Sequence, residues 1–293
     1  MAWVETTMGY VEISRRNPTC YIFLIDQSGS MSEVIANEPG RVKADVLKDI
    51  INRFLTNLVV SCTKAEGVRD YFYVSAIGYG LNVGSAFIGP LANKDLVPIS
   101  EIADKPARIE ERLKEDGAGG VVKTKFPIWF DAVADGQTPM CQALNKAKGI
   151  LEGWLSSHPN CHPPIVINLT DGAATDGNPL IPAEELKNIK SSEGNVLLYN
   201  IHLSSGSATA IMLPNSEANL PDQYAQMLYN MSSPLTDDQI TYANKAHEMH
   251  LDKNSRGFMY NANGVGVFLA LDIGTKMASP SDTPEIKGDT PEH

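Results

Sequence analysis

Short apolar segments alternate along the chain with stretches of helical periodicity. Four runs are apolar at almost every position and end at polar residues or glycine: 20–25, 71–77, 165–169 and 196–201. Such runs are typical of strands that are buried on both faces, as in a parallel sheet covered by helices. Apolar residues recur every three or four positions in the segments between and after them: 46–58, 140–155, 184–189 and 224–231. The alternation predicts an α/β fold, a three-layer doubly wound domain with a central, mostly parallel sheet.

One region interrupts this alternation. Residues 93–130 combine a charged stretch, for which we predict a helix over 102–113, with a glycine-rich segment and the aromatic residues Phe126, Trp129 and Phe130. We interpret this region as an insertion over one edge of the sheet.

The remaining boundaries follow from composition. We expect a short N-terminal extension over 1–15, one domain over 16–276, and a tail over 277–293. Because the tail is polar, rich in proline and without periodicity, it is expected to be disordered.

Charge narrows the classes of partner. The 293 residues include 24 Lys and Arg against 35 Asp and Glu, which gives a net charge of −11 and an isoelectric point near 5.0. This balance argues against nucleic acid, whose phosphates attract basic surfaces, and against anionic membranes. No apolar run approaches the ~18 residues of a membrane span. Four scattered cysteines without a Cys-x-x-Cys pair favour free thiols in a reducing compartment, and we expect a cytoplasmic protein.

Oxygen-bearing side chains gather in three segments that the fold would bring to one place. In open α/β sheets the carboxyl ends of the strands form the binding edge, and two of the loops follow such strand ends. The third segment precedes the helix predicted from residue 140. Together they present two carboxylates and three hydroxyls, from Asp26, Ser28, Ser30, Thr138 and Asp171. Hard oxygen donors of this kind suit Mg²⁺ or Mn²⁺ rather than zinc or copper.

Each of these residues also has a purely structural interpretation. Asp26, Ser28 and Ser30 would cap backbone groups in a polar turn, and Asp171 would lie in a Thr-Asp-Gly turn. Thr138, followed by Pro139, has the pattern of a helix N-cap and first helical residue. Asp176, in a second Thr-Asp-Gly sequence, is expected to form a surface turn.

Taken together, the three segments resemble a known site. Asp26-x-Ser28-x-Ser30, then Gly136-Gln137-Thr138-Pro139, then Thr170-Asp171-Gly172 are similar in order and type to the metal-ion-dependent adhesion site of von Willebrand factor A (VWA) domains. The resemblance extends from about residue 16 to about residue 276. The segment 256–262 also resembles the one before the last helix in bacterial cytoplasmic members, closest to the standalone TerY-like group.

The resemblance implies a binding site without catalysis. In the family, hydroxyls matching those of Ser28, Ser30 and Thr138 contact Mg²⁺, while aspartates matching Asp26 and Asp171 hold it directly or through water. A carboxylate from a protein partner completes the coordination. The TerY-like group is associated with protein kinases and PP2C-type phosphatases in bacterial stress or defence systems, and other cytoplasmic members work with MoxR-type ATPases.

Two alternatives remain open. The first is a metal-dependent phosphoryl or phosphodiester hydrolase, although the chain lacks Gly-x-Ser-x-Gly and the phosphate-binding loop of NTPases. An aspartyl-phosphate enzyme would have a second carboxylate two residues after Asp26, where this chain has Ser28. The second is a structural adaptor that binds its partner through the 93–130 insertion, with aromatic anchors such as Trp129, while the ion only stiffens the loops.

Overall fold

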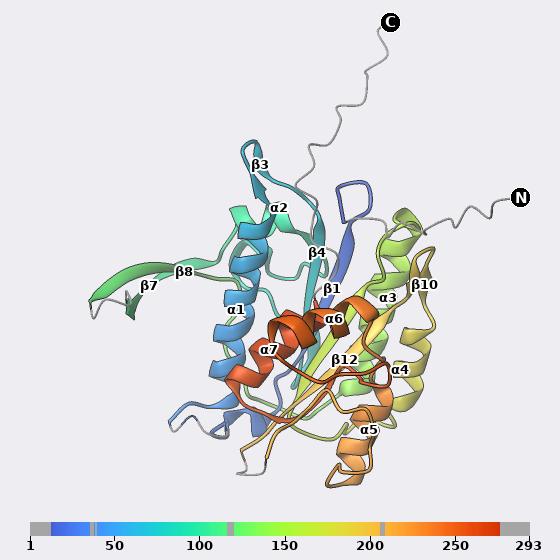
Figure 1. Cartoon of the computed structure of the whole chain (residues 1–293). Helices are drawn as coiled ribbons and strands as arrows, with labels where there is room; N and C mark the ends of the chain where they lie inside the picture. Colours follow the sequence, from blue (N-terminus) through green and yellow to red (C-terminus); the bar gives the residue numbers. More distant parts are fainter. Residues whose placement is uncertain (1–12, 36–37, 39, 116–119, 206–208, 276–293) are drawn as a thin grey trace, which may run out of the picture.

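The computed structural model describes residues 13–35, 38, 40–115, 120–205 and 209–275. Its centre is a sheet in the order β13-β14-β12-β9-β1-β4-β5, with β6 also paired to β4 (Figure 1). The five parallel strands are β1 (Thr19–Asp26), β4 (Phe72–Tyr79), β9 (Ile165–Thr170), β12 (Leu197–Leu203) and β14 (Phe258–Ala262). The antiparallel ones are β5 (Val83–Ser85), β6 (Val97–Pro98) and β13 (Ile211–Met212). The predicted α/β class with a mostly parallel sheet is confirmed.

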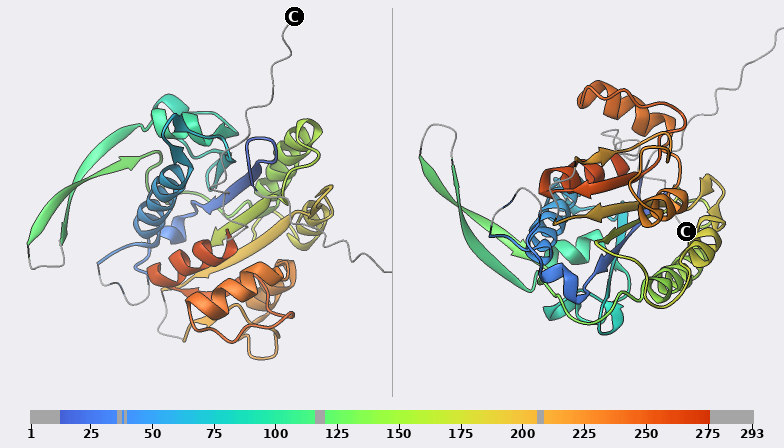
Figure 2. Two further views of the ribbon diagram at one scale, coloured as in Figure 1. Left: turned by 45° about the horizontal axis from the view of Figure 1, so that its top comes forward. Right: turned by 90° about the horizontal axis from the view of Figure 1, so that it is seen from below.

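Helices cover both faces of this sheet (Figure 2). One face packs against α1 (Lys43–Cys62), α2 (Ile99–Asp104), α6 (Asp237–Ala246) and α7 (Gly264–Gly274). The other packs against α3 (Met140–Ser157), α4 (Leu180–Lys187) and α5 (Gln223–Met231). Strand β1 is buried along its whole length, and its successive side chains enter the two cores alternately. None of the described helices is long and apolar enough to cross a membrane.

Minor elements complete the chain. They are the 3₁₀ turns η1 (Gly29–Ser32) and η2 (Gly89–Leu91), and the short strand pairs β2 (Thr63–Lys64) with β3 (Gly67–Val68) and β10 (Lys190–Ser191) with β11 (Gly194–Asn195). Most of the expected N-terminal extension and the whole of the expected tail lie outside the described residues.

The prediction of a helix over 102–113 is wrong beyond Asp104. Helix α2 ends at Asp104, because Pro106 disfavours helical geometry at Lys105 and has no N–H to donate. Strand β7 (Arg108–Glu115) follows and pairs antiparallel with β8 (Val121–Ile128). The four-residue spacing of Ile109 and Leu113 imitates a helical face, and the pairing with β8 overrides it.

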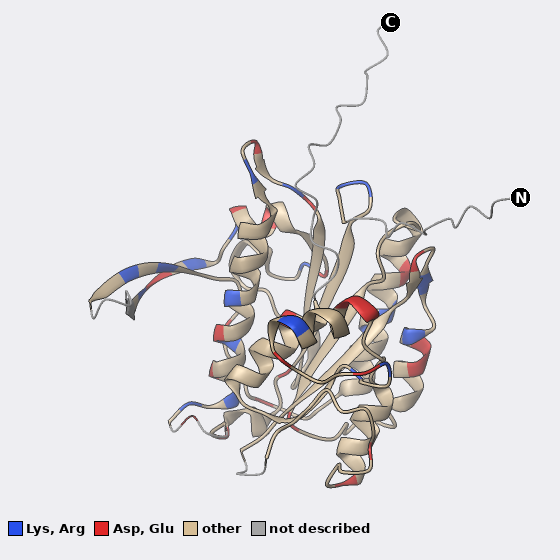
Figure 3. Ribbon diagram, in the orientation of Figure 1, with Lys and Arg blue, Asp and Glu red and all other residues tan. Residues whose placement is uncertain are grey.

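The β7–β8 hairpin extends away from the body (Figures 1 and 2). Acidic and basic residues are mixed along it (Figure 3). The Arg112 guanidinium lies 3.8 Å from the centre of the Phe126 ring and 2.8 Å from Asp49 on α1. Trp129 and Phe130, which follow β8, are 2% and 3% exposed in the core, so Trp129 is not an exposed anchor.

Asn52 fixes the root of the hairpin to α1. Its Oδ1 accepts the Trp129 N–H at 2.8 Å, and its Nδ2 donates to the Phe130 carbonyl at 3.0 Å. The side chain is fully buried. One amide side chain therefore satisfies a buried donor and a buried acceptor on the segment that leaves β8.

Asn52→Ala should lower the free energy of unfolding by about 2–3 kcal/mol, because it leaves both backbone groups without a partner in the core. Urea unfolding followed by circular dichroism measures this. Asn57→Ala, on an exposed position of the same helix, serves as the matched control and should change stability by less than ~0.5 kcal/mol. Equal losses in the two variants would contradict the anchoring role.

Candidate metal centre

The register of two parallel strands brings the first and third loops together. Ile25 on β1 is level with Leu169 on β9, so Asp26 and Thr170 end their strands side by side. The Thr170 hydroxyl donates to Asp26 Oδ2 at 2.7 Å, and the Ser28 N–H donates to Oδ1 at 2.9 Å. Asp26 is only 1% exposed. Burial raises the pKa of its carboxyl, and hydrogen bonds from Ser28 and Thr170 oppose that rise.

A continuous line of contacts joins four of the five predicted residues. Ser28 Oγ and Ser30 Oγ are 3.1 Å apart, and the Ser30 hydroxyl donates to Asp171 Oδ1 at 2.7 Å. Ser30 belongs to the η1 turn that begins directly after Ser28. The structure thus places the Asp-x-Ser-x-Ser loop and the Thr-Asp-Gly loop in direct side-chain contact.

The loop of Thr138 is bound to both of the others through its backbone. The Gly29 N–H donates to the Gly136 carbonyl at 3.1 Å, and the Thr138 carbonyl accepts the Thr175 N–H at 3.0 Å. Gly136 has a φ of +92°, and a Cβ there would fall 2.3 Å from the Leu81 nitrogen. Glycine is therefore required for this close approach.

Thr138 does not cap α3, so this structural interpretation was wrong. Pro139 occupies the N-cap position, and no side chain of its own caps the helix. Instead, Asp176 accepts the N–H groups of Cys141 at 3.0 Å and Gln142 at 2.9 Å. The carboxylate also suits the positive end of the helix dipole. Because Asp176 caps α3, the Thr138 hydroxyl does not serve as its cap.

Lys43 and Glu33 belong to the same cluster, although the sequence did not suggest them. The Lys43 ammonium lies 2.8 Å from Asp171 Oδ2 and 2.9 Å from Glu33 Oε2. Hydrogen bonds from Lys43 and then from Ser205 lower the pKa of Glu33. Thr170, which the motif contained without an assigned role, is the hydrogen-bond donor that orients Asp26.

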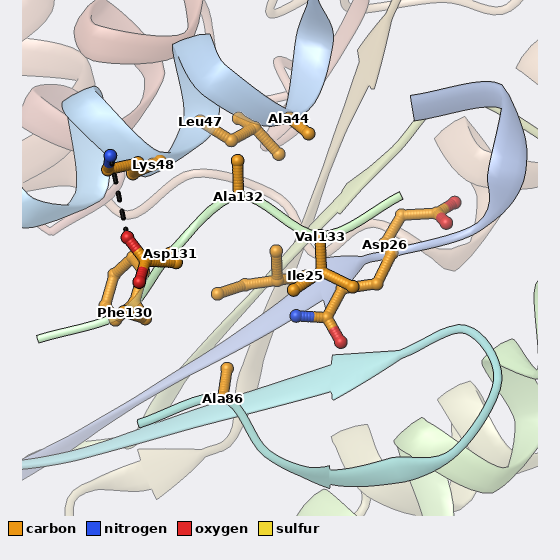
Figure 4. Close-up of a pocket in the computed structure, with 11 residues that line it drawn as sticks. Ile25, Asp26, Ala44, Leu47, Lys48, Ala86, Phe130, Asp131, Ala132 and Val133 are labelled. Atoms are coloured by element: carbon orange, nitrogen blue, oxygen red, sulfur yellow. Dashed lines mark ion pairs between the residues drawn. The ribbon is translucent and has the colours of Figure 1, made fainter. Parts of the chain in front are cut away.

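A pocket beside Asp26 is mainly apolar (Figure 4). Its walls include Ile25, Ala44, Leu47 and Ala86, and the ion pair of Lys48 with Asp131 closes one side at 3.6 Å. The Asp26 carboxylate points away from these apolar side chains (Figure 4). The carboxylate of Asp26 therefore does not line the apolar part of this pocket.

The donor set fits a hard divalent cation. Two carboxylates and three hydroxyls come from three loops that are tied to one another. Among the described residues, no group of three or more His, Cys, Asp or Glu side chains is arranged to hold a metal. Any ion at this edge would thus depend mainly on hydroxyl oxygens, and Ser28, Ser30 and Thr138 are the residues that could supply them.

The similarity of this chain to known proteins is found among solved structures. No protein-family model matches the sequence, and no curated protein matches it significantly. The manganese-loaded TRAP protein of Plasmodium vivax is similar, with a TM-score of 0.42 and 13% identity over 89% of this chain and 74% of that one. The vWF domain of the pilus tip protein Mfa5 from Porphyromonas gingivalis has a TM-score of 0.31 and 15% identity, over 56% of this chain and 40% of that one. The pilus adhesin RrgA of Streptococcus pneumoniae has a TM-score of 0.31 and 16% identity, over 57% of this chain and 22% of that one.

The chain thus spans less than half the length of these two pilus chains. The fold class stated above rests on the strand order and helices of this chain itself.

Asp176→Ala should lower the free energy of unfolding by about 1 kcal/mol, the usual effect of losing a capping carboxylate. Urea denaturation measures it. Asp222→Ala, which removes the side-chain cap of α5, is the matched control and should lose a similar amount. An unchanged unfolding free energy in Asp176→Ala alone would contradict its role at α3.

Proposed function

We propose that this chain is a VWA-type interaction domain that binds Mg²⁺, with Mn²⁺ as the alternative, and captures a protein partner through the ion. The observation that carries the proposal is the line of contacts from Asp26 through Ser28 and Ser30 to Asp171 at the carboxyl edge of the sheet. Thr138 is the fifth ligand of the proposal.

The charge of the chain supports a carboxylate-bearing partner only if a cation is present. A protein with a net charge of −11 repels acidic groups, and a divalent ion at the site would supply the local positive charge that an Asp or Glu of the partner needs. By the resemblance to TerY-like proteins, we propose a cytoplasmic partner in a bacterial stress or defence system. A protein kinase, a PP2C-type phosphatase and a MoxR-type ATPase are the three classes to test.

The surroundings of Asp26 support binding rather than catalysis. Both carboxylate oxygens of Asp26 already accept hydrogen bonds, from the Ser28 N–H and the Thr170 hydroxyl. An aspartyl-phosphate enzyme would also have a second carboxylate two residues after Asp26, where this chain has Ser28. We therefore propose that the protein is not an enzyme.

Thermal unfolding in increasing MgCl₂ tests the ion site. An ion that binds only the folded protein adds about 2.7 kcal/mol of stability at a hundredfold excess over Kd, so the wild-type melting temperature should rise. Asp26→Ala and the double variant Ser28→Ala/Ser30→Ala should show no rise. Ser32→Ala removes a hydroxyl of the same turn that bonds the Gly29 carbonyl, and it should respond like the wild type.

Two results would contradict the proposal. The first is the absence of any shift in wild type up to millimolar MgCl₂ and MnCl₂. The second is Mg²⁺-dependent hydrolysis of p-nitrophenyl phosphate that disappears in Asp26→Ala, which would favour the hydrolase.

A second candidate function is favoured by the hairpin. Ile109, Leu113 and Val121 are 55%, 73% and 61% exposed, and the strand register places all three on one face of the ribbon. Apolar side chains in this position suit a metal-independent contact with a partner. The buried Trp129 and Phe130 are excluded from it.

Affinity capture with three forms of the protein separates the two functions. If the ion site binds the partner, Asp26→Ala should lose a protein that the wild type retains in MgCl₂, and the double variant Leu113→Ser/Val121→Ser should keep it. The opposite pattern, with retention by Asp26→Ala and loss by the hairpin variant, would favour the adaptor function.

A further inference from the structure

Lys43 is a buried cation inside the candidate metal centre. It is 3% exposed, and its ammonium lies between Asp171 and Glu33. Resting on the proposed function, we propose that Lys43 is a built-in competitor of the divalent ion for Asp171, which keeps the loops assembled without the ion and holds the affinity for Mg²⁺ low.

Helix stability does not explain a lysine at this position. Lys43 is the first residue of α1, and a positive charge at a helix N-terminus opposes the helix dipole. Its backbone N–H donates to the Glu33 carbonyl at 3.0 Å, a bond that any residue except proline would make. The placement of the ammonium is therefore accounted for by the two carboxylates.

Asp171 needs a positive partner in the absence of an ion. Its side chain is fully buried in its ion pair with Lys43, and a buried carboxylate without compensation is strongly unfavourable. Its Oδ1 accepts the Ser30 hydroxyl and its Oδ2 accepts Lys43, so both oxygens are occupied. Lys43 thereby stabilises the arrangement in which the loops already lie together.

The same contact disfavours a second cation. Two positive charges that share one carboxylate repel each other, and this repulsion is strong where solvent is excluded. Glu33 reduces this repulsion between the ammonium and the ion, because its carboxylate also binds the ammonium. Its side chain is 55% exposed. Lys43 therefore retains an acceptor when Asp171 turns toward an ion. The Ser205 hydroxyl, which donates to Glu33 Oε2 at 2.8 Å, holds this second acceptor in place.

The test is a titration of MgCl₂ and MnCl₂ by isothermal calorimetry, together with thermal unfolding, in wild type and Lys43→Met. Methionine keeps much of the apolar stem and removes the charge. We expect the affinity to rise about tenfold, while the metal-free melting temperature falls, so that addition of Mg²⁺ shifts the melting temperature of Lys43→Met more than that of wild type.

Lys148→Met is the matched control. It changes the net charge equally, but Lys148 is 30% exposed and its partner is Glu185 on the surface. Because such a pair is screened by solvent and salt, the affinity should change less than about twofold.

Glu33→Gln tests the inference in a second way, on an exposed residue whose replacement the fold should tolerate. Glutamine removes the negative charge that shares the ammonium with Asp171, so Mg²⁺ should bind about threefold more weakly. If Lys43→Met does not fold, Lys43→Gln takes its place, and the same rise in affinity is expected.

The outcomes separate this inference from the proposed function. If wild type binds Mg²⁺ but Lys43→Met binds it equally or more weakly, the competing role of Lys43 is overturned and the metal site stands. An unchanged affinity in Glu33→Gln also overturns that role. If neither wild type nor Lys43→Met binds either ion at millimolar concentration, both the metal site and the inference are overturned.

Discussion

The parallel pairing of β1 with β9 is the constraint on which the site depends. It ends both strands at the same level, so that Asp26 meets Thr170 and the next residue, Asp171, reaches Ser30. Three polar side chains behind this edge also form hydrogen bonds with one another. The Tyr79 hydroxyl donates to Asn168 at 2.6 Å, and Asn168 donates to Asn200 at 3.0 Å. A buried polar chain with its partners present fixes the relative positions of strands. The loops thus start from strand ends that are rigidly placed.

Much of this arrangement could be predicted from local patterns. Continuous apolar runs identified the strands, and the three-and-four spacing identified α1 and α3, because both signals depend on burial in the local element. The structure also brings four of the five predicted residues, Asp26, Ser28, Ser30 and Asp171, into contact with one another, although their role as ligands stays a prediction. The metal itself stays a prediction.

The missed features depend on partners that are distant in the sequence. The hairpin strand Arg108–Glu115 has a helical spacing, and only pairing with β8 decides its conformation. Asp176 caps a helix that begins far before it in the sequence, at Met140, where Thr138 was the local candidate. Lys43 gives no signal of its own, because a lysine in the first turn of a helix is usually solvated. Its burial against Asp171 comes from tertiary packing.

Helix α1 connects the two regions for which functions are proposed. It begins with Lys43 at the metal centre, and Asn52 on the same helix holds the segment that leaves the hairpin. That segment continues to the site, where the Asp135 N–H donates to the Gln27 carbonyl at 2.6 Å and Gly136 accepts from Gly29. The segment that joins the hairpin to Thr138 is thus held at both ends, by Asn52 at the hairpin root and by Gln27 and Gly29 at the site.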